Sequence, residues 1–449
     1  MARPEAAQSI AEPGIADNAG NFRHAPYPIL LKKRINARLA IVCLAAASVG
    51  LSMVVISLAK LLLVICGLAT LLFTRRTSAR PSPLAVTCTP MALLLVLLTF
   101  ALSLLWSVAP AAEALGSMAK YGKLLVIPVM MLLIQSRREA MYALGAFMLA
   151  QLFLLASSWM LVVHLPVPWA TSNMALTNYS VFSSYLDQSI ISAVFAALCW
   201  HLRILAPGRF GRHLAVLAAF LALVMVLFVF RGRSGHAVAI ALLSITIMWE
   251  LPKRYRAVVV LLPFMLALGL YAGSSKVRER LSLVATEVQT YSSHEEQATS
   301  SGIRLNFWQR AAQLIGQHPL AGSGVGSWST EYNRLQSAQN PTHPPIAGNS
   351  NPHQEYLLWG VQLGIAGILM FLGLLLCMLR DTLKMEQPYA RAAQSTLLAL
   401  AVACLFNASL YDAQIGDFFC VLIGLLLALG LTQNTDASPE TTSQDKQAA

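Results

Sequence analysis

The chain has 449 residues, of which 57% are hydrophobic and only 12% charged, and its mean hydropathy is +0.62. A soluble protein of this size carries about a quarter charged residues, so the composition excludes a soluble enzyme, a disordered scaffold and a secreted disulfide module. The apolar runs are long and continuous, which indicates membrane-spanning helices and excludes an outer-membrane β-barrel.

The chain is expected to begin and end with a disordered tail, because residues 1–34 and 433–449 are largely polar and hold no signal-peptide core. Between the tails, residues 35–273 and 354–432 are predicted to form an all-α polytopic membrane domain of about twelve transmembrane helices. The apolar segments are roughly 37–54, 57–74, 88–107, 119–135, 140–164, 186–206, 212–230, 233–251, 256–273, 354–379, 390–410 and 415–432.

The net charge is +12, and the distribution of the basic residues indicates the membrane topology, since most of them lie in the short loops of one predicted side. Cytoplasmic loops carry the excess of Lys and Arg, so both termini are predicted to be cytoplasmic, and no nucleic-acid partner is expected. Residues 274–353 then form one long periplasmic loop. Apolar residues at helical spacing predict surface helices at 277–288 and 302–316, whereas 318–328 and 340–356 are predicted to be irregular.

His353 is the first candidate for chemistry, because it stands where the long loop re-enters the membrane. A neutral imidazole at the water–lipid boundary can take a proton from an alcohol, which makes His353 a candidate general base. A solvated or helix-capping histidine is the alternative interpretation.

Arginines on the predicted outer side favour a phosphorylated lipid as ligand, because a guanidinium is always charged and can fork onto phosphate oxygens. Arg304 lies on a predicted loop helix one turn before Trp308, and Arg231 and Arg233 occupy a tight turn, where either one can be the ligand. The alternative for each arginine is ordinary snorkelling to anionic head groups. Lys120 and Lys123 extend the same basic rim.

Glycine and acidic residues give weaker signals. Gly322, Gly324 and Gly326 can bring backbone amides to a phosphate, but no strand–loop–helix phosphate motif surrounds them, so a flexible loop is the preferred interpretation. Asp412 can orient a histidine or bind sugar hydroxyls, and a solvated turn is the alternative. The acidic residues of the outer side are scattered, so neither a metal site nor any other cofactor is expected.

The stretch from about residue 212 to 410 resembles the O-antigen ligase and polymerase superfamily of the bacterial inner membrane. That family carries a His-[Asn/Ser/Gln] pair, nine residues and Gly-x-x-[Gly/Thr/Tyr], which His353-Gln354 and Gly364–Gly367 match in full. Arg304 stands 49 residues before His353, near the position of an essential loop arginine, and Arg233-Ser234-Gly235 is similar to the membrane-edge arginine motif. Asp412 is near a family acidic position.

The resemblance implies a GT-C-like architecture and a ligase in the inner membrane of a Gram-negative bacterium. Such a ligase transfers a polysaccharide from undecaprenyl pyrophosphate to a sugar hydroxyl of lipid A–core at the periplasmic face, by metal-independent, inverting displacement. The expected catalytic residues are His353 and Arg304; the expected pyrophosphate ligands are Arg233, Arg231, Lys123 and Lys120; Gln354, Trp308 and Asp412 are expected to support them. An O-antigen polymerase, a protein O-oligosaccharyltransferase and, from another class, a lipid or polysaccharide transporter are the alternatives.

Overall fold

The computed structural model describes residues 37–73, 87–273, 300–339 and 349–436, with isolated positions at 275, 278, 279 and 282. Every regular element in these ranges is a helix, which confirms the all-α prediction. The tail 1–34, the tail beyond residue 436 and almost all of the predicted helix 277–288 lie outside the described residues.

Seven helical stretches of the described ranges are long and apolar enough to cross a membrane. They are α2 (Met53–Phe73), α5 with α6 (Ala111–Leu133), α7 (Arg137–Val162), α9 (Tyr185–Leu202) with the turn that continues it to Leu205, α10 (Gly208–Val224) with the turn that continues it to Val229, α16 (Glu355–Thr382) and α18 from Ala413 to Gly430. Helix α18 itself continues to Asp436. Three apolar helices are shorter: α1 (Ala37–Ser48), α4 (Thr89–Ser103) and α12 (Leu262–Gly273).

Two more helices fall in predicted apolar segments, α11 (Arg233–Glu250) and α17 (Gln387–Ala403). Each has polar residues along its length, such as His236 in α11 and Arg391 in α17. A helix therefore occupies every apolar segment that the sequence predicts, and seven of the described stretches are long and apolar enough to cross a membrane; the predicted number of twelve crossings is not confirmed.

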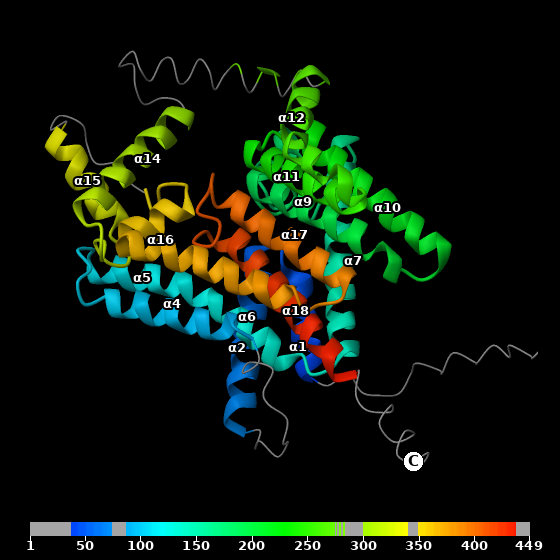
Figure 1. Cartoon of the computed structure of the whole chain (residues 1–449), viewed down its shortest axis with the longest axis horizontal. Helices are drawn as coiled ribbons and strands as arrows, with labels where there is room; N and C mark the ends of the chain where they lie inside the picture. Colours follow the sequence, from blue (N-terminus) through cyan, green and yellow to red (C-terminus); the bar gives the residue numbers. More distant parts are fainter. Residues whose placement is uncertain are drawn as a thin grey trace, which may run out of the picture. The chain divides into compact units, whose positions relative to one another are not determined.

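The helix predicted at 302–316 is α14 (Ser300–Gln317), and a second helix, α15 (Trp328–Gln339), follows it. Figure 1 shows both beyond the start of α16, where α14 and α15 pack on that helix. The ring of Phe307 on α14 meets Trp328 and Tyr332 of α15 edge to face, at 5.7 and 5.1 Å between centroids. These aromatic contacts hold α14 against its neighbours.

The glycines at 322–326 are neither a flexible loop nor a phosphate cradle, so both sequence-based interpretations were wrong. All three glycines have positive φ, and their segment is pressed against the membrane helices. A Cβ on Gly322 would lie 2.4 Å from the backbone of Gln362, and one on Gly324 would lie 2.3 Å from Cα of Ser107. The amide of Gly324 donates to Gln362 O at 2.9 Å, so it is occupied by the protein itself. Only glycine fits such a backbone conformation at such close approach.

Helix α16 changes direction at Gly364, which has φ 69° and ψ −158° inside the helix. The kink lets the amide of Ile365 donate to Pro319 O at 2.7 Å. A Cβ on Gly364 would lie 2.5 Å from the same oxygen, and one on Gly367 would lie 2.4 Å from Trp359 O. The Gly-x-x-Gly group of the sequence therefore seats the segment after α14 on α16.

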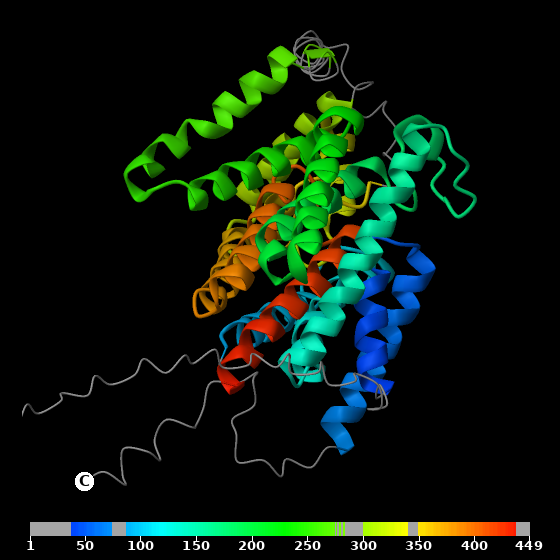
Figure 2. The same cartoon turned by 90° about the vertical axis from the view of Figure 1, so that its right-hand side faces the viewer.

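Helices α9, α11 and α17 pack against one another, and Figure 2 shows α9 and α11 together in green. Gly235 makes the close contact between α9 and α11, because a Cβ there would lie 2.2 Å from Ser189 Oγ. The starts of α9 and α11 and the end of α17 thus meet at one end of the three-helix group.

Candidate active site

Arg304 stands at the centre of the candidate site. Its Nη2 donates to Asn407 Oδ1 at 3.4 Å, and Nδ2 of Asn407 donates to Ser234 Oγ at 3.1 Å. Asn407 therefore links α14 to the first turn of α11, where Arg233 lies. Burial lowers the pKa of Arg304, and the charge of Arg233 lowers it further, so the two guanidinium groups interact electrostatically. Two cations held together in a half-buried place are suited to a ligand with several negative charges.

His353 lies within electrostatic reach of Arg304. Burial, followed by the charge of Arg304, lowers the pKa of His353, so the imidazole is neutral at pH 7. Its ring is nearly parallel to that of Phe307, at 6.1 Å between centroids and 17° between planes. Since Phe307 is three residues after Arg304, one face of α14 presents both side chains to the histidine.

The backbone of His353 is held in a left-handed conformation, with φ 53°. Its amide donates to Asn351 Oδ1 at 2.8 Å, and Nδ2 of Asn351 donates to Asp412 Oδ1 at 3.2 Å. A non-glycine residue in this region is strained, and such strain is found where a side chain must be aimed. Asn351 thus connects the histidine to Asp412.

Asp412 belongs to the connection between α17 and α18, together with Asn407. Burial raises the pKa of Asp412, while Lys123, Lys120, the Asn351 amide and Arg304 act in the opposite direction. Arg304 therefore acts electrostatically on both Asp412 and His353.

The two lysines lie on the other side of this connection. The Nζ of Lys123 is buried and donates to Tyr411 O at 3.2 Å and to Asp412 O at 2.6 Å. Lys120 is exposed, with its Nζ 4.1 Å from the centre of the Tyr411 ring. Lys123 is thus hydrogen-bonded to backbone carbonyls, and these bonds hold the segment around Asp412 in place.

The remaining predicted residues lie around this centre. The side chain of Gln354 accepts from Leu357 N at 2.7 Å and caps α16. Trp308 is half-buried, and its indole nitrogen has no hydrogen-bond partner among the described residues. Arg231 is exposed, and it is Arg233 whose charge acts on Arg304.

Sequence analysis did not single out Asn351, Asn407 or Glu355. Glu355 is fully buried, and it accepts from Trp359 Nε1 at 2.9 Å and from the amides of Leu410 and Tyr411 at 2.9 and 3.1 Å. It fixes the 404–412 connection to the start of α16. A glutamate two residues after the candidate base was visible in the sequence, whereas the amides of Leu410 and Tyr411 that it binds lie 55 and 56 residues further along the chain.

Residues 218–372 match the O-antigen ligase family. This segment is similar to the O-antigen ligase domain. It runs from the middle of α10 into α16 and holds Arg233, Arg304 and His353, so the ligase match covers the centre of the site. Asn407 and Asp412 follow the matched segment, and Lys123 precedes it. No curated protein matches the chain.

Among the residues that the structure describes, no three His, Cys, Asp or Glu side chains are grouped as metal ligands. The matched segment contributes the neutral imidazole of His353 and the guanidinium groups of Arg304 and Arg233, and the connection after α17 contributes the carboxyl group of Asp412.

Proposed function

We propose that the protein is an O-antigen ligase, which transfers a polysaccharide from undecaprenyl pyrophosphate to a sugar hydroxyl of lipid A–core at the periplasmic face of the inner membrane. The observation that carries this proposal is that Arg304 interacts electrostatically with both Arg233 and His353. The arginines can neutralise the charge that develops on a departing pyrophosphate, and the histidine can accept the proton that leaves the acceptor hydroxyl.

In the proposed reaction, the acceptor hydroxyl attacks the anomeric carbon of the donor while His353 takes its proton. The new C–O bond forms as the bond between that carbon and the pyrophosphate oxygen breaks, and both electrons stay with the pyrophosphate. Arg304 and Arg233 neutralise the charge that builds up there. A single displacement of this kind inverts the anomeric carbon.

Asp412 and Asn351 act as positioning groups in this proposal. Their hydrogen bond at 3.2 Å, with the bond from His353 N to Asn351, supports the histidine from the side of the 404–412 connection. Lys123 stabilises the same segment by donating hydrogen bonds to the backbone carbonyls of Tyr411 and Asp412.

The test is a reconstitution of the purified full chain in detergent with the lipid-linked glycan donor and three separate acceptors: lipid A–core, a second lipid-linked glycan, and an acceptor protein. We expect product on lipid A–core, undiminished by EDTA, and none with His353→Ala. Product on the second lipid-linked glycan would instead assign a polymerase, and product on the protein an oligosaccharyltransferase. Failure of all three reactions in the absence of a second compartment would contradict an enzyme.

A further inference from the structure

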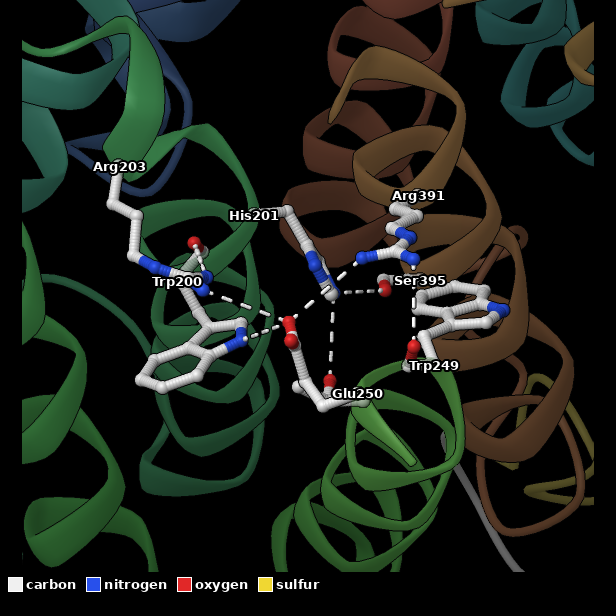
Figure 3. A network of polar contacts seen from close by, with 8 residues as sticks. Trp200, His201, Arg203, Trp249, Glu250, Arg391 and Ser395 are labelled. Carbon is white, nitrogen blue, oxygen red and sulfur yellow. Dashed lines mark hydrogen bonds and ion pairs between the residues drawn. The ribbon is translucent and has the colours of Figure 1, made fainter. Parts of the chain in front are cut away.

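A second polar cluster lies at the end of α9, α11 and α17 that is far from the candidate site. Figure 3 shows it: Trp200, His201 and Arg203 from the end of α9 and just beyond, Trp249 and Glu250 from the end of α11, and Arg391 and Ser395 from the early part of α17. Helices α9 and α11 each have 18 residues. At about 1.5 Å per residue they are about 27 Å long, close to the thickness of the hydrocarbon core of a bilayer. The cluster therefore lies at the opposite water–lipid boundary from the site.

Two arginines share one carboxylate in this cluster. Glu250 Oε1 is 3.6 Å from Arg203 Nη2 and 3.8 Å from Arg391 Nη1, and all three side chains are partly exposed. Contacts of this length are weak compared with close, charge-assisted hydrogen bonds at about 2.7–2.9 Å. Each guanidinium carries five N–H groups, so the carboxylate leaves the pair with a net positive charge and with donor capacity.

The surroundings of the two arginines are those of a membrane interface. Arg203 lies over the ring of Trp200 at 4.0 Å from its centre, and Arg391 lies 5.6 Å from that of Trp249. Indoles concentrate at the level of lipid head groups. Between them, His201 is buried, and its Nδ1 has no hydrogen-bond partner among the described residues. An orphaned buried nitrogen of this kind is typical of a place that binds a further polar group or water.

We propose that Arg203 and Arg391, flanked by Trp200 and Trp249, bind the phosphate of an anionic membrane phospholipid. The phosphate oxygens accept hydrogen bonds from both guanidinium groups, and Glu250 competes with them for the same donors. Basic pockets between membrane helices are suited to such head groups. The proposal is independent of the transfer reaction.

Binding at this place has a consequence for the candidate site. The lipid phosphate joins the far ends of α9 and α17, while Glu250 keeps α11 beside them. The near ends of the same helices carry Arg233 and lead to Asn407. An anionic lipid thus stabilises the packing of the three helices on which the site is built.

Native mass spectrometry of the full chain, with phosphatidylglycerol and phosphatidylcholine as separate probes, tests the proposal. We expect the protein to retain phosphatidylglycerol in preference to phosphatidylcholine. We also expect bound phosphatidylglycerol to raise the thermal unfolding temperature of the protein. Arg203→Gln or Arg391→Gln should weaken that binding roughly tenfold, the effect of losing one charge-assisted hydrogen bond. Glu250→Gln should act in the opposite direction and strengthen it.

The matched controls are Arg209→Gln and Arg212→Gln, which remove exposed arginines at the start of α10 outside the cluster. They should leave retention unchanged. An equal loss in these controls would overturn the site in favour of general charge attraction, and displacement of the lipid by inorganic phosphate alone would overturn the assignment to a lipid. If the cluster only fastened helices, Glu250→Gln would lower the unfolding temperature and leave lipid retention unaltered, which would also overturn it.

Discussion

At the scale of single residues, His353 combines a strained backbone with a neutral side chain. Its left-handed φ of 53° is held by the bond to Asn351, and its ring is fixed beside Phe307. Strain of this kind costs about 1–3 kcal/mol and persists only where the surroundings enforce it. The aim of the imidazole is therefore set by the fold before any substrate binds.

His353→Ala should lower the transfer rate by about 10²–10⁴, the usual effect of losing a positioned base. Because burial and Arg304 lower the pKa of His353, its protonated fraction grows only well into the acid range. The acid limb of the wild-type rate profile, measured with saturating donor, should therefore lie below pH ~6.5, the ordinary pKa of histidine.

His164→Ala is the matched control, since His164 is an exposed histidine that also has a positive φ, 58°. It should keep the wild-type rate. If His353→Lys retained most of the rate and transfer persisted in acid, His353 would be a cationic phosphate ligand and the base assignment would be wrong.

Arg233→Ala and Arg231→Ala should differ, although the sequence left the two arginines equivalent. The charge of Arg233 acts on Arg304, whereas Arg231 is exposed. Steady-state kinetics with the lipid-linked donor should show a loss of tenfold or more in kcat/KM for Arg233→Ala, on the order of one charge-assisted hydrogen bond. A larger loss for Arg231→Ala than for Arg233→Ala would reverse the assignment of Arg233 as the pyrophosphate ligand.

Arg304→Lys should be partly active in the same assay, because lysine keeps the positive charge but lacks the bidentate fork of the guanidinium.

His353 and Arg304 could be predicted from the sequence because motif spacing along the chain identifies them. Asn351 and Asn407 could not, since their roles lie in hydrogen bonds to Asp412 and to Ser234, which are 61 and 173 residues away in the chain. An asparagine in a loop carries no periodicity that would single it out.

At the scale of helices, the kink of α16 is what joins the Gly-x-x-Gly group to the segment after α14. Gly364→Ala should destabilise the protein strongly, because its Cβ would lie 2.5 Å from Pro319 O in a backbone conformation with positive φ. The comparison is Gly373→Ala in the same helix, where a Cβ meets nothing within 4 Å. That change should preserve or slightly raise stability, by up to about 1 kcal/mol of helix propensity.

Thermal unfolding of both variants in detergent measures the difference. Equal unfolding temperatures for Gly364→Ala and Gly373→Ala would show that the contact with Pro319 contributes nothing.

Helix α14 was predictable because Ile303, Phe307 and Leu314 follow helical spacing. Helix α15 carries a similar stripe of Trp328, Tyr332 and Leu335, and those three side chains are buried against their neighbours. The segment is polar on average, so the apolar stripe was not recognised in the sequence. Tertiary packing of that stripe stabilises the helix. A search for aromatic residues four apart would have found it.

At the scale of the whole molecule, a charged pair joins the beginning of the chain to its end. Lys60 Nζ of α2 lies 2.5 Å from Asp417 Oδ2 of α18, and Asp417 is fully buried. Removing one partner of a buried pair costs about 3–5 kcal/mol, because the other charge is left uncompensated. Lys60→Met alone and Asp417→Leu alone should therefore both lower thermal stability.

The double variant Lys60→Met/Asp417→Leu should recover much of that loss, since no unpaired charge remains between α2 and α18. Additive destabilisation in the double-mutant cycle, measured by unfolding in detergent, would contradict the pairing. The sequence predicted both helices but not their contact, because hydrophobic segments specify that a helix crosses lipid and leave open which helix lies beside it.

The glycine segment at 322–326 looks like a surface loop in the sequence and is packed like an interior. Its three positive-φ positions closely approach the backbones of Gln362 in α16, of Ser107 just before α5 and of Ala114 within α5. In a library of all single substitutions selected for growth, this segment should tolerate change as poorly as the buried face of a helix. Connections between helices normally tolerate an inserted tag or protease site, but this tightly packed one should not, so such an insertion belongs elsewhere in the chain.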